Sequence, residues 1–368
     1  MSQPINYTVI GAGNGGKSMA AYLALMGKKV TLYNRTYAHI EVIAKRKGID
    51  LESYPEGPHG FGRLELATSD IRAALEKAEV IMVVIPSSGH ADVAKIMAPH
   101  LKDGQIILLN PGRTFGAIEF DMVLHKEGCK SNVTIAEAET FIYASRSDGP
   151  AQAHIFRIKE AVPLAALPAT RTQIVLDAIN DVYPQFIDGV NILHTGLENM
   201  GAIFHPSLTI LNSGRIESTH GNFEFYIDGV TPSVAHALEA LDRERVTVAS
   251  SLGIRVRTAT EWLELAYNVK GRNLYEAIQN QTGYYGIKAP STLTHRYIFE
   301  DVPMSLIPIA SAGHQYGISV RAMESIIRLA CIINQTDYYR AGRTMERLGI
   351  KDLSVKELTE YVNKGRNH

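Results

Sequence analysis

The segment 198–206, which reads E-N-M-G-A-I-F-H-P, contains side chains that could move a proton inside a cleft. It has the pattern of a helix, on which Asn199 and His205 lie six residues apart. Pro206 follows the histidine and predicts a helix break, because proline removes a backbone hydrogen bond. Histidine changes its charge near neutral pH, so its ring can donate and accept a proton. His205 is therefore a candidate for acid–base chemistry.

A second polar segment lies between two predicted helices and carries His295, Arg296, Glu300 and Asp301. A guanidinium pairs with a carboxylate through two parallel hydrogen bonds, which an ammonium group cannot match. A carboxylate bonded to the far ring nitrogen of a histidine fixes the tautomer of that histidine. These residue types suit a substrate that has a carboxylate and exchanges a proton. The residues alone leave open which of the two acidic side chains would act with a histidine.

A glycine-rich motif near the N-terminus predicts a dinucleotide site. An apolar run, 7–10, is followed by G-x-G-x-x-G and then by a predicted helix, 17–27. The first glycine permits a tight turn, the second leaves room for the pyrophosphate, and the third lets the helix pack closely on the strand. The pyrophosphate would then lie at the positive end of the helix. The residues predicted to bind the dinucleotide in this loop are Gly11, Gly13, Asn14, Gly15 and Gly16.

The end of the next predicted strand indicates which dinucleotide is bound. In an NAD site, an acidic residue at this position binds the ribose 2′-hydroxyl. Here the strand ends in Asn34 and Arg35. An amide can bond a hydroxyl or a phosphate oxygen, and a guanidinium can pair with a 2′-phosphate and stack on adenine. Both residues are therefore predicted to bind the cofactor, which is NADP, with NAD possible. The alternative for Arg35 is a solvated residue at the start of a helix.

The elements that must position these groups are the strands of a parallel sheet. The run 80–85 is continuously apolar, as is typical of a strand buried on both faces, and 105–109 is predicted to be another buried strand. In an open parallel sheet, ligands lie outside the carboxyl ends of the strands. The residues that follow these two strands are predicted to border the cofactor, or else to be ordinary turn residues: Pro86, Ser87, Ser88 and Asn110.

The pattern along the chain predicts two domains of different class. Strand-like and helix-like segments alternate in the first half, and long helical segments replace them afterwards. We expect an α/β Rossmann domain with a doubly wound, mostly parallel sheet over 1–183, followed by an all-α substrate and catalytic domain over 184–368.

Composition excludes several classes of partner. The chain has 368 residues, 45% apolar and 20% charged, with a net charge of −1. No basic block favours nucleic acid or an anionic membrane surface, and no apolar run is long enough to span a membrane. Cys129 and Cys331 have neither zinc-site nor redox spacing, so we expect reduced thiols and no metal site. No signal-peptide pattern is visible, so a cytoplasmic location is expected.

Taken together, the Rossmann motif, the N-x(5)-H-P segment and the H-R-Y-x-x-E-D-V-P segment resemble the opine dehydrogenases of the octopine/nopaline type, over nearly the whole chain. The resemblance implies that His205 and Asp301 form a catalytic dyad and that Arg296 binds a substrate carboxylate. It also implies that Asn199 lies in the same pocket. Tyr284 is predicted to line the amino-acid pocket, against the alternative of loop packing.

The resemblance implies a reaction and a substrate class. A 2-oxo acid, commonly pyruvate, condenses with the amino group of an amino acid, and the resulting imine is reduced by NAD(P)H. The chain is shorter than many members of the family, which leaves the amine substrate open. A helical second domain also offers surfaces for a homodimer.

Two other functions remain open at this point. One is a ketopantoate reductase-like enzyme that reduces a 2-oxo acid without an amine, although the lysine expected on the first helix of the second domain is not apparent. The other is a non-catalytic NADP-binding protein, which would not need His205, Arg296 and Asp301 together.

Overall fold

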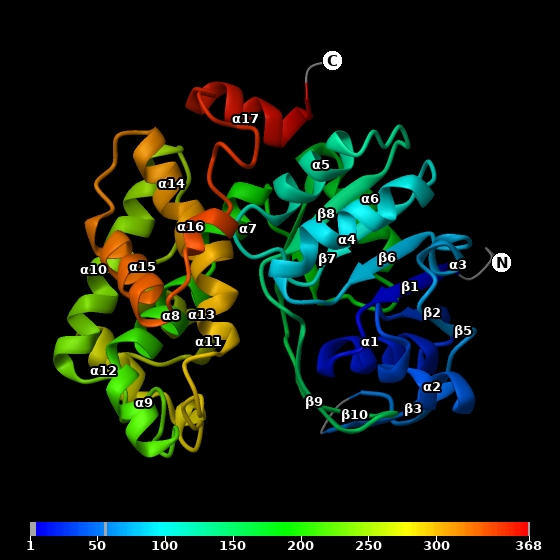
Figure 1. Cartoon of the computed structure of the whole chain (residues 1–368), viewed down its shortest axis with the longest axis horizontal. Coiled ribbons are helices and arrows are strands. Elements are labelled where there is room, and N and C mark those ends of the chain that lie inside the picture. The colour runs from blue at the N-terminus through cyan, green and yellow to red at the C-terminus, as the bar shows by residue number, and fades with distance from the viewer. Residues whose placement is uncertain (1–4, 55–56, 367–368) are drawn as a thin grey trace. The chain divides into compact units, whose positions relative to one another are not determined.

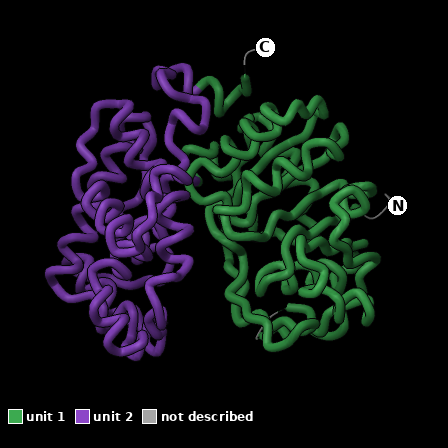
Figure 2. Tube along the Cα trace, in the orientation of Figure 1, with its two compact units in different colours: residues 1–195, 360–368 green, residues 196–359 purple. Residues whose placement is uncertain are grey.

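The computed structural model describes residues 5–54 and 57–366, which form two compact units (Figure 2). One unit runs up to Thr195 and also includes the end of the chain from Glu360 onward. The other unit comprises Gly196–Thr359. Figure 1 shows strands and helices in the first unit and helices in the second. The prediction of a Rossmann-type α/β unit and a helical unit is confirmed.

The main sheet of the first unit has the order β12-β11-β8-β7-β6-β1-β2-β5 among the described residues. Only the β8–β11 pair within it is antiparallel. The strands are β1 Asn6–Ile10, β2 Lys29–Tyr33, β5 Leu66–Thr68, β6 Val80–Val83, β7 Ile106–Leu109, β8 Thr134–Ala138, β11 Val162–Leu167 and β12 Phe186–Asp188. The central strands β6 and β7 are buried at every position, which explains their continuously apolar sequences.

Helices cover both faces of this sheet. Successive side chains of a strand point to opposite faces. The Tyr7 hydroxyl donates to the carbonyl of Ala178 in α6, and the neighbouring Thr8 hydroxyl donates to the carbonyl of Ala74 in α3. These two helices therefore lie on opposite faces. The helices of this unit are α1 Asn14–Leu25, α2 Glu41–Arg46, α3 Ile71–Leu75, α4 His90–Met97, α5 Gly116–Lys126 and α6 Thr172–Ile179.

A second, smaller sheet, which the sequence did not predict, packs on α1. Its order is β4-β3-β10-β9, with β3 Gly48–Ser53, β4 Gly60–Arg63, β9 Tyr143–Gly149 and β10 Gln152–Ile158. Helix α1 contacts all four of these strands as well as β1 and β2. The helix that follows the glycine-rich loop is therefore buried between two sheets, which holds its N-terminus in place.

The second unit is built around α8, which contacts α10, α13 and α15. Its mostly buried residues form the centre of the helical core. The helices that lie within this unit are α8 Gly201–Leu211, α9 Ser213–Thr219, α10 Pro232–Ser251, α11 Ala259–Tyr267, α12 Leu274–Asn280, α13 Arg296–Phe299, α14 Ile307–Gln315, α15 Arg321–Ile333 and α16 Tyr338–Ala341. A π-helical turn, Val302–Leu306, precedes α14.

The two units do not divide where the sequence analysis places the boundary, between 183 and 184. Strand β12 lies beyond that point and pairs with β11, and the boundary falls inside α7 (Ile192–Leu197). The last helix, α17 (Val355–Lys364), ends in the first unit, where the Tyr361 hydroxyl donates to Asp121 Oδ2 at 2.9 Å. A three-residue strand and the docking of a terminal helix leave no periodic signal in the sequence.

The predicted helix break after His205 does not occur. Pro206 lies inside α8, which continues to Leu211. A helix tolerates proline at the loss of one backbone bond, and here the burial of most of α8, Pro206 included, compensates for it.

Candidate active site

The glycine-rich loop has the geometry that its sequence predicts. Gly11 has a φ of +107°, a conformation that favours glycine. A Cβ on Gly16 would lie 1.8 Å from the carbonyl oxygen of Gly11, so helix α1 can pack this closely only on glycine. A Cβ on Gly13 would have no heavy atom within 4 Å. Gly13 is therefore not required by internal packing, and the open space beside it suits a ligand.

Gly15, which is predicted to bind the dinucleotide, also has a packing role. A Cβ on Gly15 would lie 2.7 Å from Cζ of Phe141 and 3.1 Å from Cγ1 of Val84. The ring of Phe141 thus rests on the loop, and packing alone explains this glycine. Asn14 is exposed at the start of α1, where none of the described side chains caps the helix N-terminus.

The residues after β2 both support the loop and present a cation. Asn34 Oδ1 accepts a hydrogen bond from Ala12 N at 3.2 Å, and its amide nitrogen donates to the carbonyl of Thr36 at 2.9 Å. The side chain of Asn34 therefore holds the glycine-rich loop against the end of β2. Arg35 is exposed and forms no ion pair with any of the described residues.

The predicted residues after β6 and β7 differ in exposure. Pro86 and Ser88 are exposed, whereas Ser87 is buried. The Asn110 amide nitrogen donates to the carbonyl of Leu108 at 2.9 Å. Its Oδ1 is buried and has no hydrogen-bond partner among the described residues. A buried acceptor without a partner is costly, so this atom is suited to receive a donor from a ligand.

These observations fit a dinucleotide. The open space at Gly13 and the uncapped N-terminus of α1 suit a pyrophosphate. The buried Oδ1 of Asn110 follows the end of β7, at the edge of the sheet where ligands of this fold lie. Both features lie within the first unit.

The second unit brings His205 and Asp301 together although 96 residues separate them. His205 Nδ1 lies 2.9 Å from Asp301 Oδ2. The Asp301 side chain is fully buried, whereas 21% of the His205 side chain is exposed. With Nδ1 bound to the carboxylate, Nε2 is the ring nitrogen left for proton exchange with a ligand. The geometry is that of a histidine oriented by a buried carboxylate.

A hydrogen-bonded chain extends from this pair to Asn199. The Asn199 amide nitrogen donates to Ser305 Oγ at 2.9 Å, and Ser305 Oγ is 3.4 Å from Asp301 Oδ1. Ser305 lies in the π-helical turn, a geometry often found at functional sites. Asn199 thus supports the carboxylate through Ser305. Sequence analysis did not single out Ser305, and no motif marks it.

Aromatic rings hold the other side of His205. Tyr297 stacks on the imidazole with ring centroids 4.1 Å apart, and Phe225 stacks on Tyr297 at 5.5 Å. Tyr226 packs edge-on against Phe225, and Tyr284 stacks on Tyr226. Tyr284 is therefore separated from His205 by three rings, and burial raises its pKa. Tyr297 contacts the histidine instead and was missed, although it lies within the H-R-Y segment.

Arg296 and Glu300 form an ion pair one helical turn apart, with Nη2 2.9 Å from Oε2. The Arg296 side chain is half exposed, whereas Glu300 is buried. The two adjacent acidic residues therefore have different partners, with Glu300 on the arginine and Asp301 on the histidine. Burial and the positive charge of Arg296 lower the pKa of His295, which caps the same short helix.

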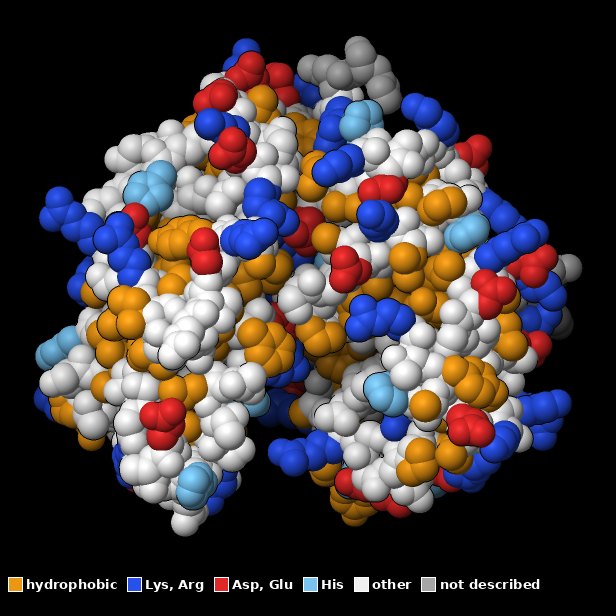
Figure 3. Space-filling model, in the orientation of Figure 1, with side chains coloured by type: hydrophobic (Ala, Val, Ile, Leu, Met, Phe, Trp, Pro, Cys, Tyr) orange, Lys and Arg blue, Asp and Glu red, His pale blue; other side chains and the backbone are white. Residues whose placement is uncertain are grey.

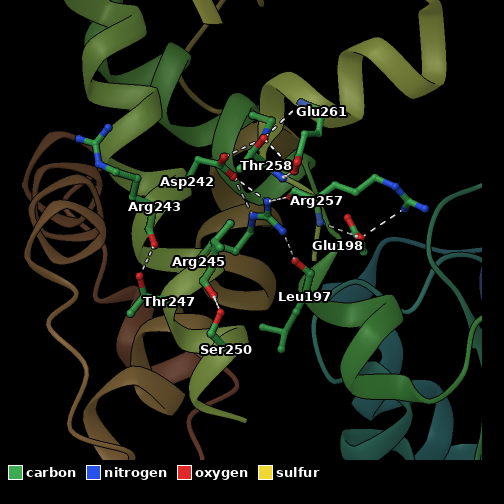
Figure 4. Close-up of polar contacts among 12 residues, drawn as sticks. Leu197, Glu198, Asp242, Arg243, Arg245, Thr247, Ser250, Arg257, Thr258 and Glu261 are labelled. Atoms are coloured by element: carbon green, nitrogen blue, oxygen red, sulfur yellow. Dashed lines mark hydrogen bonds and ion pairs between the residues drawn. The ribbon is translucent and has the colours of Figure 1, made fainter. Parts of the chain in front are cut away.

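A buried ionic network anchors the segment that leads into α8 (Figure 4). Arg245, fully buried in α10, donates to Asp242 Oδ1 and to the carbonyl of Leu197. Glu198 Oε1 accepts the backbone N–H of Arg257 at 3.0 Å, and burial raises the pKa of Glu198. Residues 197 and 198 are thereby fixed directly before Asn199.

Other kinds of site find no support among the residues that the structure describes. No group of three His, Cys, Asp or Glu side chains there could hold a metal ion. None of the helices in the described ranges is long and apolar enough to cross a membrane. On the face in Figure 3, basic and acidic side chains are interspersed.

Both halves of the chain match known families. Residues 6–111 match the N-terminus of NAD-dependent glycerol-3-phosphate dehydrogenase. Residues 189–334 match the alpha-helical domain of NAD/NADP octopine/nopaline dehydrogenase. An opine dehydrogenase of Arthrobacter sp. (strain 1C) is 37% identical over 362 residues, which cover 98% of this chain and 100% of that protein.

Solved structures share the fold over the whole chain. Octopine dehydrogenase in complex with NADH and agmatine has a TM-score of 0.83 at 19% identity, and the match covers 99% of both chains. Yersinopine dehydrogenase with NADP⁺ bound has a TM-score of 0.76 at 13% identity over 98% of both chains. At these identities, the likeness concerns the fold.

Proposed function

Because this chain belongs to the opine dehydrogenase family, it is an NAD(P)-dependent oxidoreductase acting on CH–NH groups, and we propose that it joins a 2-oxo acid to the amino group of an amino acid. The observation that carries the proposal is the His205–Asp301 pair, a proton-exchanging group next to a helix that presents Arg296. A binding protein without turnover would have no use for this pair.

The proposed reaction assigns a task to each of these side chains. The amine adds to the keto group, and the resulting carbinolamine loses water to form an imine. His205 Nε2 exchanges the protons that this sequence moves on and off oxygen and nitrogen, while Asp301 holds the ring through Nδ1. Arg296 binds a substrate carboxylate with the part of its guanidinium that is exposed. When bound, the reduced nicotinamide supplies the hydride that reduces the C=N bond.

We propose NADP as the preferred cofactor, with NAD as the alternative. Arg35 is the cation at the end of β2 where an NAD site would carry an acid, and Asn34 is engaged in holding the loop. Arg35→Asp is expected to move the ratio of kcat/KM for NADPH over NADH towards NADH by about tenfold or more, since a charge-assisted bond to phosphate is lost and a repulsion gained. An unchanged ratio would remove Arg35 from 2′-phosphate binding.

The substrates are proposed to be pyruvate and an amino acid whose identity the test reveals. The experiment follows NADPH oxidation with pyruvate, with and without a mixture of the twenty amino acids. Oxidation that needs the mixture supports condensation, and fractionating the mixture identifies the amine. Oxidation by pyruvate alone would favour a 2-oxo acid reductase of the ketopantoate reductase type. A cytoplasmic location and a homodimer stay predictions that fractionation and sedimentation would check.

A further inference from the structure

A group of charged side chains outside the dyad gathers at the carboxyl edge of the main sheet. Arg113 follows β7 and Glu139 follows β8. Lys159 lies between β10 of the smaller sheet and β11 of the main sheet, and because β11 runs antiparallel to β8, its start lies beside the end of β8. All three belong to the first unit and are partly buried. The carboxyl ends of parallel strands are where this class of fold binds its ligands. No step of the mechanism proposed above uses them.

Hydrogen bonds hold both the ammonium group and the backbone of Lys159 in place. Lys159 Nζ donates to Thr140 Oγ1 at 2.7 Å, and its backbone N–H donates to the carbonyl of Ile142 at 3.0 Å. Glu139 N in turn donates to the carbonyl of Pro163 at 2.9 Å. The segment after β8 is thus tied on both sides to the chain around Lys159. An ammonium group held in this way is already in place for a ligand.

The neighbouring segments reach the dinucleotide loop and the end of β7. Phe141, next to Thr140, rests on Gly15 of the glycine-rich loop. Gly112 N donates to the carbonyl of Ala138 at 3.1 Å, which joins the loop after β7 to the end of β8. Arg113 in that loop has a φ of +60°, and such strain in a non-glycine residue is retained where the surrounding structure imposes it, often at ligand sites. The group therefore borders the predicted cofactor site.

The charges around Lys159 make it a titrating cation. The pKa of Lys159 is lowered to about 8, mainly by burial; the negative charge of Glu139 opposes this shift, and the positive charges of Arg113 and Arg157 add to it. Burial and the two arginines thus disfavour the charged form of the ammonium group. An anion bound beside Lys159 would favour the charged form.

We propose that Lys159, together with Arg113, binds the α-carboxylate of a substrate at the carboxyl edge of the sheet in the dinucleotide-binding unit. The inference rests on the proposed function, in which each of the two substrates has a carboxylate. Arg296 accounts for one of them. A second carboxylate needs a second cation, and Lys159 is a fixed, partly buried one.

The test compares wild type with Lys159→Met, Lys159→Arg and the control Lys126→Met, an exposed lysine of α5. Initial rates are measured with NADPH, pyruvate and the amino-acid mixture. Lys159→Met is expected to raise the KM of one substrate about 10- to 100-fold, the usual effect of losing a charge-assisted hydrogen bond. A rise for pyruvate alone assigns the site to the oxo acid, and a rise for the mixture alone assigns it to the amino acid. Unchanged KM values for both substrates would overturn the proposal.

The pH dependence gives a second readout that a structural role would not produce. The charged fraction of Lys159 falls as the pH rises through about 8, so the wild-type KM should rise above that pH. Lys159→Arg, whose guanidinium stays charged, is expected to flatten this rise while keeping the KM near that of wild type at pH 7. The same rise in the arginine variant would contradict the assignment.

Failure of the proposed function would be recognised separately, because wild type itself would then show no amine-dependent oxidation. In that case, pyruvate and the amino-acid mixture are each titrated by calorimetry into the NADPH-loaded wild type and Lys159→Met. Weaker binding of either probe by the variant would still support a carboxylate site. Equal binding of both would overturn it.

Discussion

Replacing Asp301 by asparagine tests the dyad, because the exchange removes the charge and keeps the shape. Asp301 is fully buried, with Oδ2 2.9 Å from His205 Nδ1 and Oδ1 3.4 Å from Ser305 Oγ. A carboxamide with its nitrogen towards Ser305 can still accept the Nδ1 proton, so the tautomer can survive. What is lost is the negative charge that stabilises the imidazolium when His205 has taken up a proton, and no water can replace it in a fully buried position.

We expect the Asp301→Asn exchange to lower the rate of the chemical step about 10²- to 10⁴-fold, or about 3–5 kcal/mol of transition-state stabilisation. Single-turnover oxidation of bound NADPH measures this step without product release. The dissociation constant of NADPH should stay close to wild type, because the glycine-rich loop lies in the other unit. The melting temperature should also stay close to wild type, because asparagine keeps the shape of the aspartate. Asp228→Asn, an exchange at a partly exposed aspartate of the same unit, is the matched control. A rate for Asp301→Asn within threefold of wild type would refute the dyad.

Three further exchanges test the glycine-rich loop and the buried ion pair behind the dyad. Gly13→Ala is expected to weaken NADPH binding by tenfold or more at an unchanged melting temperature, because the added methyl group enters open space. An NADPH affinity of Gly13→Ala equal to that of wild type would place the pyrophosphate elsewhere. Gly16→Ala should instead lower the melting temperature, because the added methyl group would meet the carbonyl oxygen of Gly11. Arg245→Met should lower the free energy of unfolding by about 3–5 kcal/mol, since it leaves Asp242 buried without its partner. Urea titration measures this, and a loss below about 1 kcal/mol would contradict it.

Local chemistry made part of the fold predictable. Gly11 is needed for its positive φ, and Gly16 is needed because a side chain there would clash with the backbone of Gly11. The turn and the start of α1 could therefore be predicted from the residue types. The buried strands β6 and β7 are continuous apolar runs with no other good interpretation. The second sheet was not predictable in the same way, because β3 and β10 pair in parallel across about a hundred residues.

The supports of the candidate site were harder to predict than its central residues. His205 and Asp301 stand in motifs, whereas Ser305 and Tyr297 owe their positions to the π-helical turn and to ring stacking. Such contacts depend on how helices pack against one another, and no short motif in the sequence predicts that packing. Pro206 misled for the same reason, since packing around α8 keeps the helix intact despite the proline.

Glu300 and Asp301, between which the residues alone left the choice open, have different partners in the structure. Side chains four residues apart meet on one face of a helix, so Arg296 pairs with Glu300 and leaves Asp301 for the histidine. The ion pair between Arg296 and Glu300 weakens the attraction of Arg296 for a substrate carboxylate. Because Glu300 already neutralises much of the Arg296 charge, a substrate carboxylate meets a weakened cation there. A reaction between two carboxylates therefore gains from a second fixed cation, which is the part that Lys159 is suited to play.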